Sequence, residues 1–97
     1  MRIVFIGSVA FSLSALEHLI IMGAEIVGVC TLKVSKFNSD HVDLSHTSVS
    51  HGIPWLYAED INSDLAKDWI KGKAPDVIFC FGWSKLLNQK ILEFLKY

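Results

Sequence analysis

The most specific chemical signal in the sequence is a turn that follows its most apolar run. Val77–Phe81 is uninterrupted apolar sequence, and Gly82, Trp83 and Ser84 follow it directly. An aromatic side chain at the end of a buried strand either walls a pocket for a planar ligand or covers the end of the core. Ser84 has no histidine or carboxylate beside it in the sequence, so a hydrolase would lack its base, and a helix cap is the other interpretation.

A second turn with a glycine, Gly7-Ser8, follows the apolar run Ile3–Ile6. A dinucleotide site would have the pattern G-x-G-x-x-G here, but Val9 and Ser12 occupy the second and third glycine positions. No acidic residue ends the next apolar run, where such a site has one. NAD binding is therefore disfavoured. A single glycine before a helix either offers its backbone N–H groups to an anion or only makes a tight turn.

The histidines and cysteines do not form a metal-binding pattern. His41, His46 and His51 are spaced by five residues, a rotation of about 140° on a helix, so they cannot share one helical face. There is no C-x-x-C pair, and Cys30 and Cys80 lie within apolar runs. We therefore expect no metal site and two reduced core thiols, as is usual in a cytoplasmic protein.

The composition restricts the class of protein. The chain has 97 residues, a formal net charge of −1 and 52% hydrophobic residues. This length suits one domain, this apolar content excludes disorder, and a dedicated nucleic-acid module would be more basic. The uncharged run from Ile3 to Leu16 mimics a signal peptide, but Gly7-Ser8 interrupts it. No apolar stretch reaches the roughly 18 residues of a membrane helix, so we expect no membrane partner.

Apolar runs alternate with helical patterns along the chain. Strands are expected over Ile3–Ile6, Ile26–Cys30, Ile53–Tyr57 and Val77–Phe81. Pro54 suggests an edge position for the third strand. This alternation predicts parallel strands joined by right-handed crossovers. The expected fold is α/β, a three-layer Rossmann-like open parallel sheet of four strands in the order 3-2-1-4.

Helices are expected between and after the strands. The first is apolar almost all round, which predicts that it is deeply packed. It is expected over Val9–Met22, with a cap at Ser8 and a stop at Gly23. The second helix is expected from Ser39 or Asp40 to Ser50. The third is capped by Asn62 and stopped by Gly72 and Pro75, and the last begins at Ser84 or Asn88. Ligands bind such sheets beyond the carboxyl ends of the strands, where both glycine turns lie.

Three stretches of the chain resemble the formyltransferases that use 10-formyltetrahydrofolate. This superfamily includes methionyl-tRNA formyltransferase, glycinamide ribonucleotide formyltransferase and the amino-sugar formyltransferases. The stretches are MRIVFIGS followed by Phe11, HGIP at His51–Pro54, and APDVIFCFGWSKLL at Ala74–Leu87. The loop Lys36–Asp40 also resembles members close to methionyl-tRNA formyltransferase, several of which formylate nucleotide-linked amino sugars. The resemblance covers essentially all of the chain and implies a truncated formyltransferase fold, with residues 1–97 as the amino-terminal half of the catalytic domain.

The resemblance also implies a binding site at the two glycine turns. In the family, the turn after the fourth strand contacts the pterin of the folate, and the first turn faces the acceptor amine. The residues expected on the folate side are Phe81, Gly82, Trp83, Ser84, Lys85, Leu86 and Leu87, and those expected on the acceptor side are Gly7, Ser8 and Phe11. Gly7-Ser8-Val9 departs from the Gly-Thr-Pro-like turn of the methionyl-tRNA enzymes. The acceptor therefore stays open between methionyl-tRNA and an amino-sugar nucleotide.

The catalytic Asn, His and Asp of the family have no match in this sequence, which ends before the family places them, so no catalytic residue is assigned. The full-length protein is expected to be a cytoplasmic transferase of one-carbon metabolism. It would move a formyl group from 10-formyltetrahydrofolate to a primary amine, and this chain alone is expected to be inactive. The alternative is a non-catalytic module that forms a homodimer through the free edge of Val77–Phe81. A nucleotide-binding domain of another doubly wound family is disfavoured by the first turn.

Overall fold

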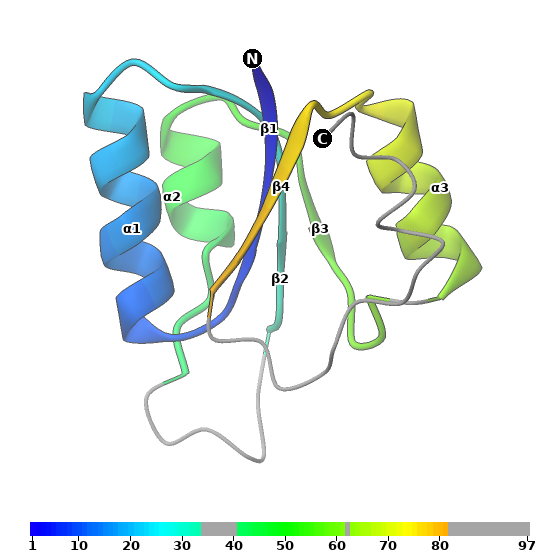
Figure 1. Ribbon diagram of the computed structural model, residues 1–97. Coiled ribbons are helices and arrows are strands. Elements are labelled where there is room, and N and C mark those ends of the chain that lie inside the picture. Colours follow the sequence, from blue (N-terminus) through cyan, green and yellow to red (C-terminus); the bar gives the residue numbers. More distant parts are fainter. Residues whose placement is uncertain (34–40, 62, 82–97) are drawn as a thin grey trace.

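A computed structural model describes residues 1–33, 41–61 and 63–81. Four strands form one sheet in the order β3-β2-β1-β4, and each neighbouring pair is parallel. The strands are β1 (Arg2–Gly7), β2 (Glu25–Thr31), β3 (Trp55–Tyr57) and β4 (Val77–Phe81). Figure 1 shows α1 (Ala10–Ile21) and α2 (Ser45–Ser50) on one face of the sheet and α3 (Asp64–Gly72) on the other. The predicted α/β class, Rossmann-like layout and strand order are confirmed.

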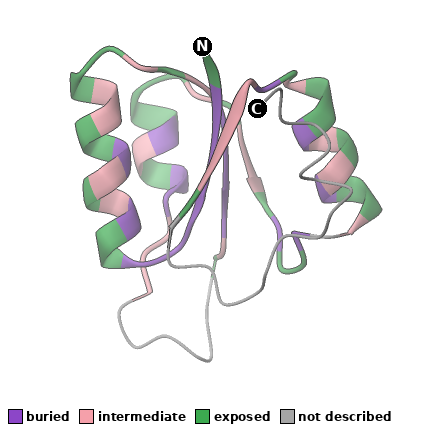
Figure 2. Cartoon of the chain, in the orientation of Figure 1, coloured by how far each residue is buried: buried purple, intermediate pink, exposed green. Residues whose placement is uncertain are grey.

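The core lies on both faces of the sheet. Val4 and Ile6 belong to the cluster that packs against α3, whereas Phe5 belongs to the cluster that packs against α1 and α2. Successive side chains of a strand point to opposite faces, so β1 contributes to both clusters. All three side chains are completely buried, and Figure 2 shows β1 buried over most of its length. This burial explains why the run Ile3–Ile6 is apolar without alternation.

The packing of α1 is shallower than its composition predicted. Leu16 is completely buried, but Phe11, Ile21 and Met22 expose 66%, 83% and 75% of their surface. The helix lies on one face of the sheet, so only one stripe of its surface meets the core. Among the described residues, no helix has the length and apolarity that a membrane crossing requires.

The ends of α1 differ in part from the prediction. Val9 is the N-cap, and Ser8 is not. Ser8 is buried and its carbonyl accepts a hydrogen bond from the Val42 N–H at 2.8 Å, so the turn runs one residue further before the helix begins. At the other end, Gly23 has a φ of 81° just after the helix, as the predicted stop requires.

The other two described helices begin later than predicted. α2 begins at Ser45, several residues after the predicted start at Ser39 or Asp40, which lie outside the described residues. α3 begins after Ser63, whose Oγ accepts a hydrogen bond from the backbone N–H three residues on at 3.2 Å. The cap is therefore one residue beyond Asn62. The helix predicted from Ser84 or Asn88 lies outside the described residues.

The positions of the strands in the described sheet explain why one cysteine is buried and the other is exposed. β3 lies at an edge, as Pro54 predicted, although it begins at Trp55 rather than at Ile53. β4 matches its prediction and lies at the other edge of the four-stranded sheet. Cys80, near the carboxyl end of β4, is exposed, which contradicts the expected core thiol. Cys30 in the inner strand β2 is buried, as predicted.

Candidate functional site at the carboxyl edge of the sheet

The carboxyl ends of the four parallel strands gather at one edge of the sheet, at the lower side of Figure 1. In the register of β1 and β4, Gly7 lies opposite Phe81. The predicted acceptor turn and the first residue of the predicted folate segment are therefore neighbours in space. The rest of that predicted segment, Gly82–Leu87, lies outside the described residues, and so does the side chain of Phe81.

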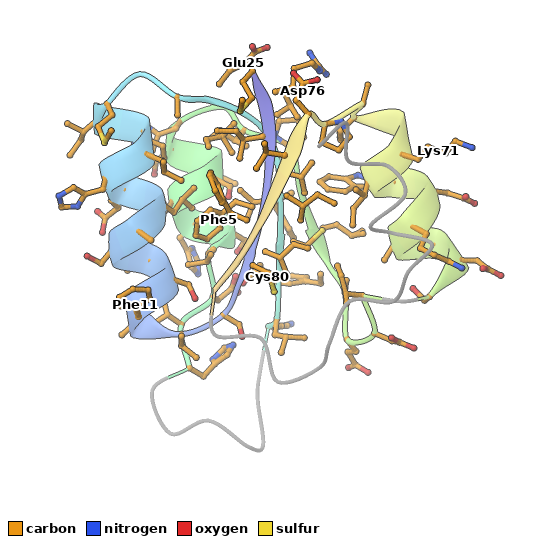
Figure 3. The ribbon with its side chains drawn as sticks, in the orientation of Figure 1. Phe5, Phe11, Glu25, Lys71, Asp76 and Cys80 are labelled. Carbon is orange, nitrogen blue, oxygen red and sulfur yellow. The ribbon has the colours of Figure 1, made fainter. Side chains whose placement is uncertain are left out.

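The first glycine turn, Gly7–Val9, is buried, whereas the first two residues of α1 are exposed to solvent. Gly7 is buried, and Ser8 is only 1% exposed. Ser8 Oγ has no hydrogen-bond partner in the described part of the chain. Burying a hydroxyl without a hydrogen-bond partner costs free energy, so this position could hydrogen-bond a polar group of a ligand. Phe11, the second residue of α1, is largely exposed, and Figure 3 shows it at the end of the helix nearest this edge.

A short segment that leads into α2 and includes its first residue crosses this edge. We call residues 41–45 the crossing segment. His41 forms an isolated antiparallel bridge with Val9, and His41 Nε2 lies 2.7 Å from the carbonyl oxygen of Leu32. A carbonyl oxygen only accepts, so Nε2 donates and carries the proton. Further along, the Leu44 N–H donates to Thr31 Oγ1 at 3.1 Å, and both residues are completely buried. The crossing segment is thus bound to the ends of β1 and β2.

The crossing segment is also bound to the end of β3. Tyr57 donates its hydroxyl proton to Asp43 Oδ2 at 2.6 Å, and the Ser45 N–H donates to Asp43 Oδ1 at 2.8 Å. Ser45 Oγ lies 3.0 Å from the Tyr57 hydroxyl oxygen. Since the tyrosine has given its one proton to Asp43, the serine hydroxyl is the donor in this contact. Trp55 packs edge-on against the Tyr57 ring, with 4.6 Å between ring centroids.

These contacts perturb the ionisation of both partners. Burial alone would raise the pKa of Asp43, but hydrogen bonds from Tyr57 and Ser45 and the nearby His46 hold it below its ordinary value of 3.8. The hydrogen bond to Asp43 raises the pKa of Tyr57 above 10.0. At neutral pH the pair is therefore a carboxylate and a neutral phenol, which is a structural link and not a proton relay. Burial raises the pKa of the nearby Cys30 thiol to about 12, so it remains protonated.

The described residues at this edge supply binding groups and no complete catalytic set. Ser8 Oγ is without a base, because nothing in the described part of the chain accepts its proton. Within residues 1–33, 41–61 and 63–81, no group of three or more His, Cys, Asp and Glu side chains gathers in a way that could hold a metal ion. The edge can orient a ligand through backbone groups and a buried hydroxyl.

Sequence reasoning located the strand ends but not the crossing segment. Asp43 and Ser45 fell within a predicted helix, and Tyr57 was noted only as the end of a strand. The sequence did contain a signal. Tyr57 ends a strand that Pro54 places at an edge, and a tyrosine hydroxyl in such a position usually finds a hydrogen-bond partner, which Asp43 can provide. Their contact nevertheless depends on the path of the chain between β2 and α2, which local patterns do not specify.

The fold defines the class of protein: an open parallel α/β sheet, a class in which ligands bind beyond the carboxyl ends of the strands. No protein-family model matches the chain. Similarity to curated proteins covers nearly all of it. The chain is 35% identical over 98 residues to a methionyl-tRNA formyltransferase of Thermotoga maritima, covering 96% of the chain and 31% of that protein. It is 33% identical over 100 residues to a methionyl-tRNA formyltransferase of Bacillus licheniformis, covering 99% of the chain and 32% of that protein.

A third relative, a methionyl-tRNA formyltransferase of Chloroflexus aggregans, is 28% identical over 97 residues, covering 96% of the chain and 31% of that protein. The chain is thus similar to formyltransferases over nearly its whole length. It spans about a third of the length of these curated relatives.

Proposed function

We propose that this chain is the folate-side part of an enzyme that transfers a formyl group from 10-formyltetrahydrofolate to a primary amine. The observation that carries the proposal is the 35% identity to a methionyl-tRNA formyltransferase over 96% of the chain. In the reaction, the amine nitrogen attacks the formyl carbon, a new C–N bond forms, and the bond from that carbon to the folate nitrogen breaks. The developing oxyanion must be stabilised and a proton must leave the amine.

We propose that the two sides of the site are the two glycine turns. Phe81–Leu87 would contact the folate, and Gly7, Ser8 and Phe11 would face the acceptor. The register that sets Gly7 opposite Phe81 supports this division, since it brings the two segments to one edge. The acceptor is methionyl-tRNA or an amino-sugar nucleotide. The names of the relatives favour the first, and the departure of Gly7-Ser8-Val9 from the turn of the methionyl-tRNA enzymes favours the second.

The test of the folate side is a fluorescence titration. The chain has three tryptophans, so the double variant Trp55→Phe and Trp69→Phe leaves Trp83 as the only one. We expect a saturable change in its emission on addition of 5-formyltetrahydrofolate. The matched control is Trp83→Phe in the otherwise unchanged chain, which should show no saturable change. A double variant that folds and shows no saturation up to millimolar folate contradicts the proposal.

The chain alone is proposed to be inactive, because no residue in it matches the catalytic Asn, His and Asp of the family. Incubation of the purified chain with 10-formyltetrahydrofolate and each acceptor should give no formylated product. Detection of product above the uncatalysed rate would overturn this part of the proposal.

A second candidate function is a non-catalytic module that pairs with a copy of itself. The observation that favours it is the position of β4, which within the described residues pairs with β1 on one side only. An open edge of apolar sequence is a template for strand pairing. Light scattering at increasing concentration distinguishes the two candidates, because a monomer that binds folate supports the enzyme and a dimer that does not bind folate supports the module.

A further inference from the structure

The crossing segment is bound to the first turn through its backbone. Val42 donates its N–H to the Ser8 carbonyl at 2.8 Å, and His41 pairs with Val9 in an antiparallel bridge. The hydrogen bond from Val42 flanks the pair of Val9 and His41 and is part of that bridge, so both describe one backbone contact at the junction of β1 and α1. The conformation of the turn therefore depends on where the crossing segment lies.

His41 is the side chain that fixes the near end of the crossing segment. Its Nε2–H donates to the Leu32 carbonyl at 2.7 Å, and the ring is half-buried. Leu32 is the first residue after β2, so this bond joins the segment to the chain just beyond an inner strand of the sheet. The far end is held by Leu44, whose N–H donates to the buried Thr31 Oγ1.

We infer that His41 is a positioning residue that holds the crossing segment against the turn Gly7–Val9 and so sets the acceptor side of the site. It does this from the side of the turn away from Phe81, and the described contacts of its ring are with backbone. The link from the turn to acceptor binding rests on the proposed function. The mechanical link from His41 to the turn does not.

The first experiment measures the mechanical link in the purified chain. Amide hydrogen exchange is followed for the Val42 N–H, together with the amide chemical shifts of Ser8 and Val9, in wild type, His41→Ala and His41→Gln. The matched control is His18→Ala, which removes an exposed histidine from α1. We expect His41→Ala to speed the exchange of Val42 about tenfold relative to the control and to shift the Ser8 and Val9 signals, because local protection reflects local contacts. Unchanged exchange and shifts in His41→Ala overturn the inference.

The second experiment measures the consequence for the site. Dissociation constants are compared for 5-formyltetrahydrofolate and for two acceptor probes, methionyl-tRNA and an amino-sugar nucleotide. Loss of one supporting hydrogen bond should weaken binding of whichever acceptor binds by about 3- to 10-fold and leave the folate constant within about twofold. His41→Gln should recover most of the affinity, since its amide can donate to the Leu32 carbonyl.

The outcomes separate the effect of His41 on the turn from the effect of the turn on acceptor binding. Equal weakening of folate and acceptor, or no rescue by glutamine, assigns His41 to general stability and overturns the positioning role. If the wild-type chain binds no probe, the proposed function fails, while the exchange of Val42 still decides whether His41 holds the turn.

Discussion

At the scale of single residues, Asp43 and Tyr57 show how a polar contact reports on a fold. The carboxylate accepts the tyrosine proton at 2.6 Å and the Ser45 N–H at 2.8 Å, so its charged form is stabilised. Its pKa is lowered, and the pKa of Tyr57 is raised. The contact between Asp43 and Tyr57 contributes to both shifts, so a substitution of Asp43 should affect both.

We predict that Asp43→Asn reduces stability at neutral pH but not in acid. The pKa of Asp43 is lower in the folded chain, so its stabilisation is complete well above pH 3.8 and is lost as the pH falls through the folded-state pKa. Urea unfolding at pH 7 and near pH 3 should show a difference between wild type and variant at the first pH only. Asp68→Asn, at an exposed position on α3, serves as the control and should show no such pattern. A difference that persists at low pH would mean that the carboxylate charge is not the cause.

The same variant tests Tyr57 directly. The chain has two tyrosines, so Tyr97→Phe leaves Tyr57 as the only one that titrates. In that background the absorbance change of the phenol should be centred above pH 10.0, and adding Asp43→Asn should move it downward. An unmoved midpoint would show that the contact is absent in solution.

At the scale of secondary-structure elements, α3 packs on β2 through one close approach. A Cβ added to Gly28 would lie 2.7 Å from Trp69 Cη2 and 3.0 Å from Trp69 Cζ3. The indole therefore needs a residue without a side chain beneath it. Lys73 Nζ lies over that ring, 4.9 Å from its centroid, and Lys73 Cγ would lie 3.4 Å from the added Cβ.

We predict that Gly28→Ala lowers the free energy of unfolding by about 1–2 kcal/mol, because overpacking outweighs the lower chain entropy that alanine brings to the unfolded state. The matched control is Gly72→Ala, where an added Cβ meets nothing within 4 Å and the position is the last of α3. That change should be neutral or stabilising by up to about 1 kcal/mol. Chemical denaturation of both variants measures this, and equal effects at the two glycines would contradict the packing argument.

The strands were predictable at this scale and the helix ends were not. β4 coincides with the predicted run Val77–Phe81, because a short continuous apolar run is typical of a strand even at the edge of the described sheet. The caps moved from Ser8 to Val9 and from Asn62 to Ser63. Asn62 and Ser63 are both good caps by local chemistry, but Val9 has no capping oxygen, so its position follows from how the turn meets the sheet.

At the scale of the whole molecule, the edge opposite the candidate site is closed by the first charged residue of the chain. Arg2 donates from Nη2 to the Lys73 carbonyl at 2.6 Å and from Nε to the Ala74 carbonyl at 3.2 Å. Its backbone N–H donates to Asp76 Oδ2 at 2.9 Å, and its guanidinium lies 3.5 Å from Glu25. Figure 3 shows Glu25 and Asp76 together at the end of the molecule where the N-terminus lies. One side chain thus joins β1, β2 and the turn from α3 to β4.

We predict that Arg2→Ala lowers the free energy of unfolding by about 1–2 kcal/mol, since several partly exposed hydrogen bonds are lost at once. Arg2→Lys should recover little of this, because a lysine cannot donate two fixed N–H groups to neighbouring carbonyls. Glu25→Gln should cost under about 0.5 kcal/mol, because the ion pair is half-exposed. Denaturation midpoints of the three variants give the comparison, and a fully stable Arg2→Lys would show that charge alone is sufficient.

The amino-acid sequence by itself determined the strands, their parallel layout and the resemblance to formyltransferases, because hydrophobic period and turn chemistry are local properties of the chain. It also placed both glycine turns at the ends of strands. Only the tertiary structure decided that Gly7 lies opposite Phe81, that Tyr57 meets Asp43, and that His41 holds the first turn. These contacts join residues far apart along the chain. They depend on strand register and on the path of the connecting segments, which arise when the two faces of the sheet are packed together.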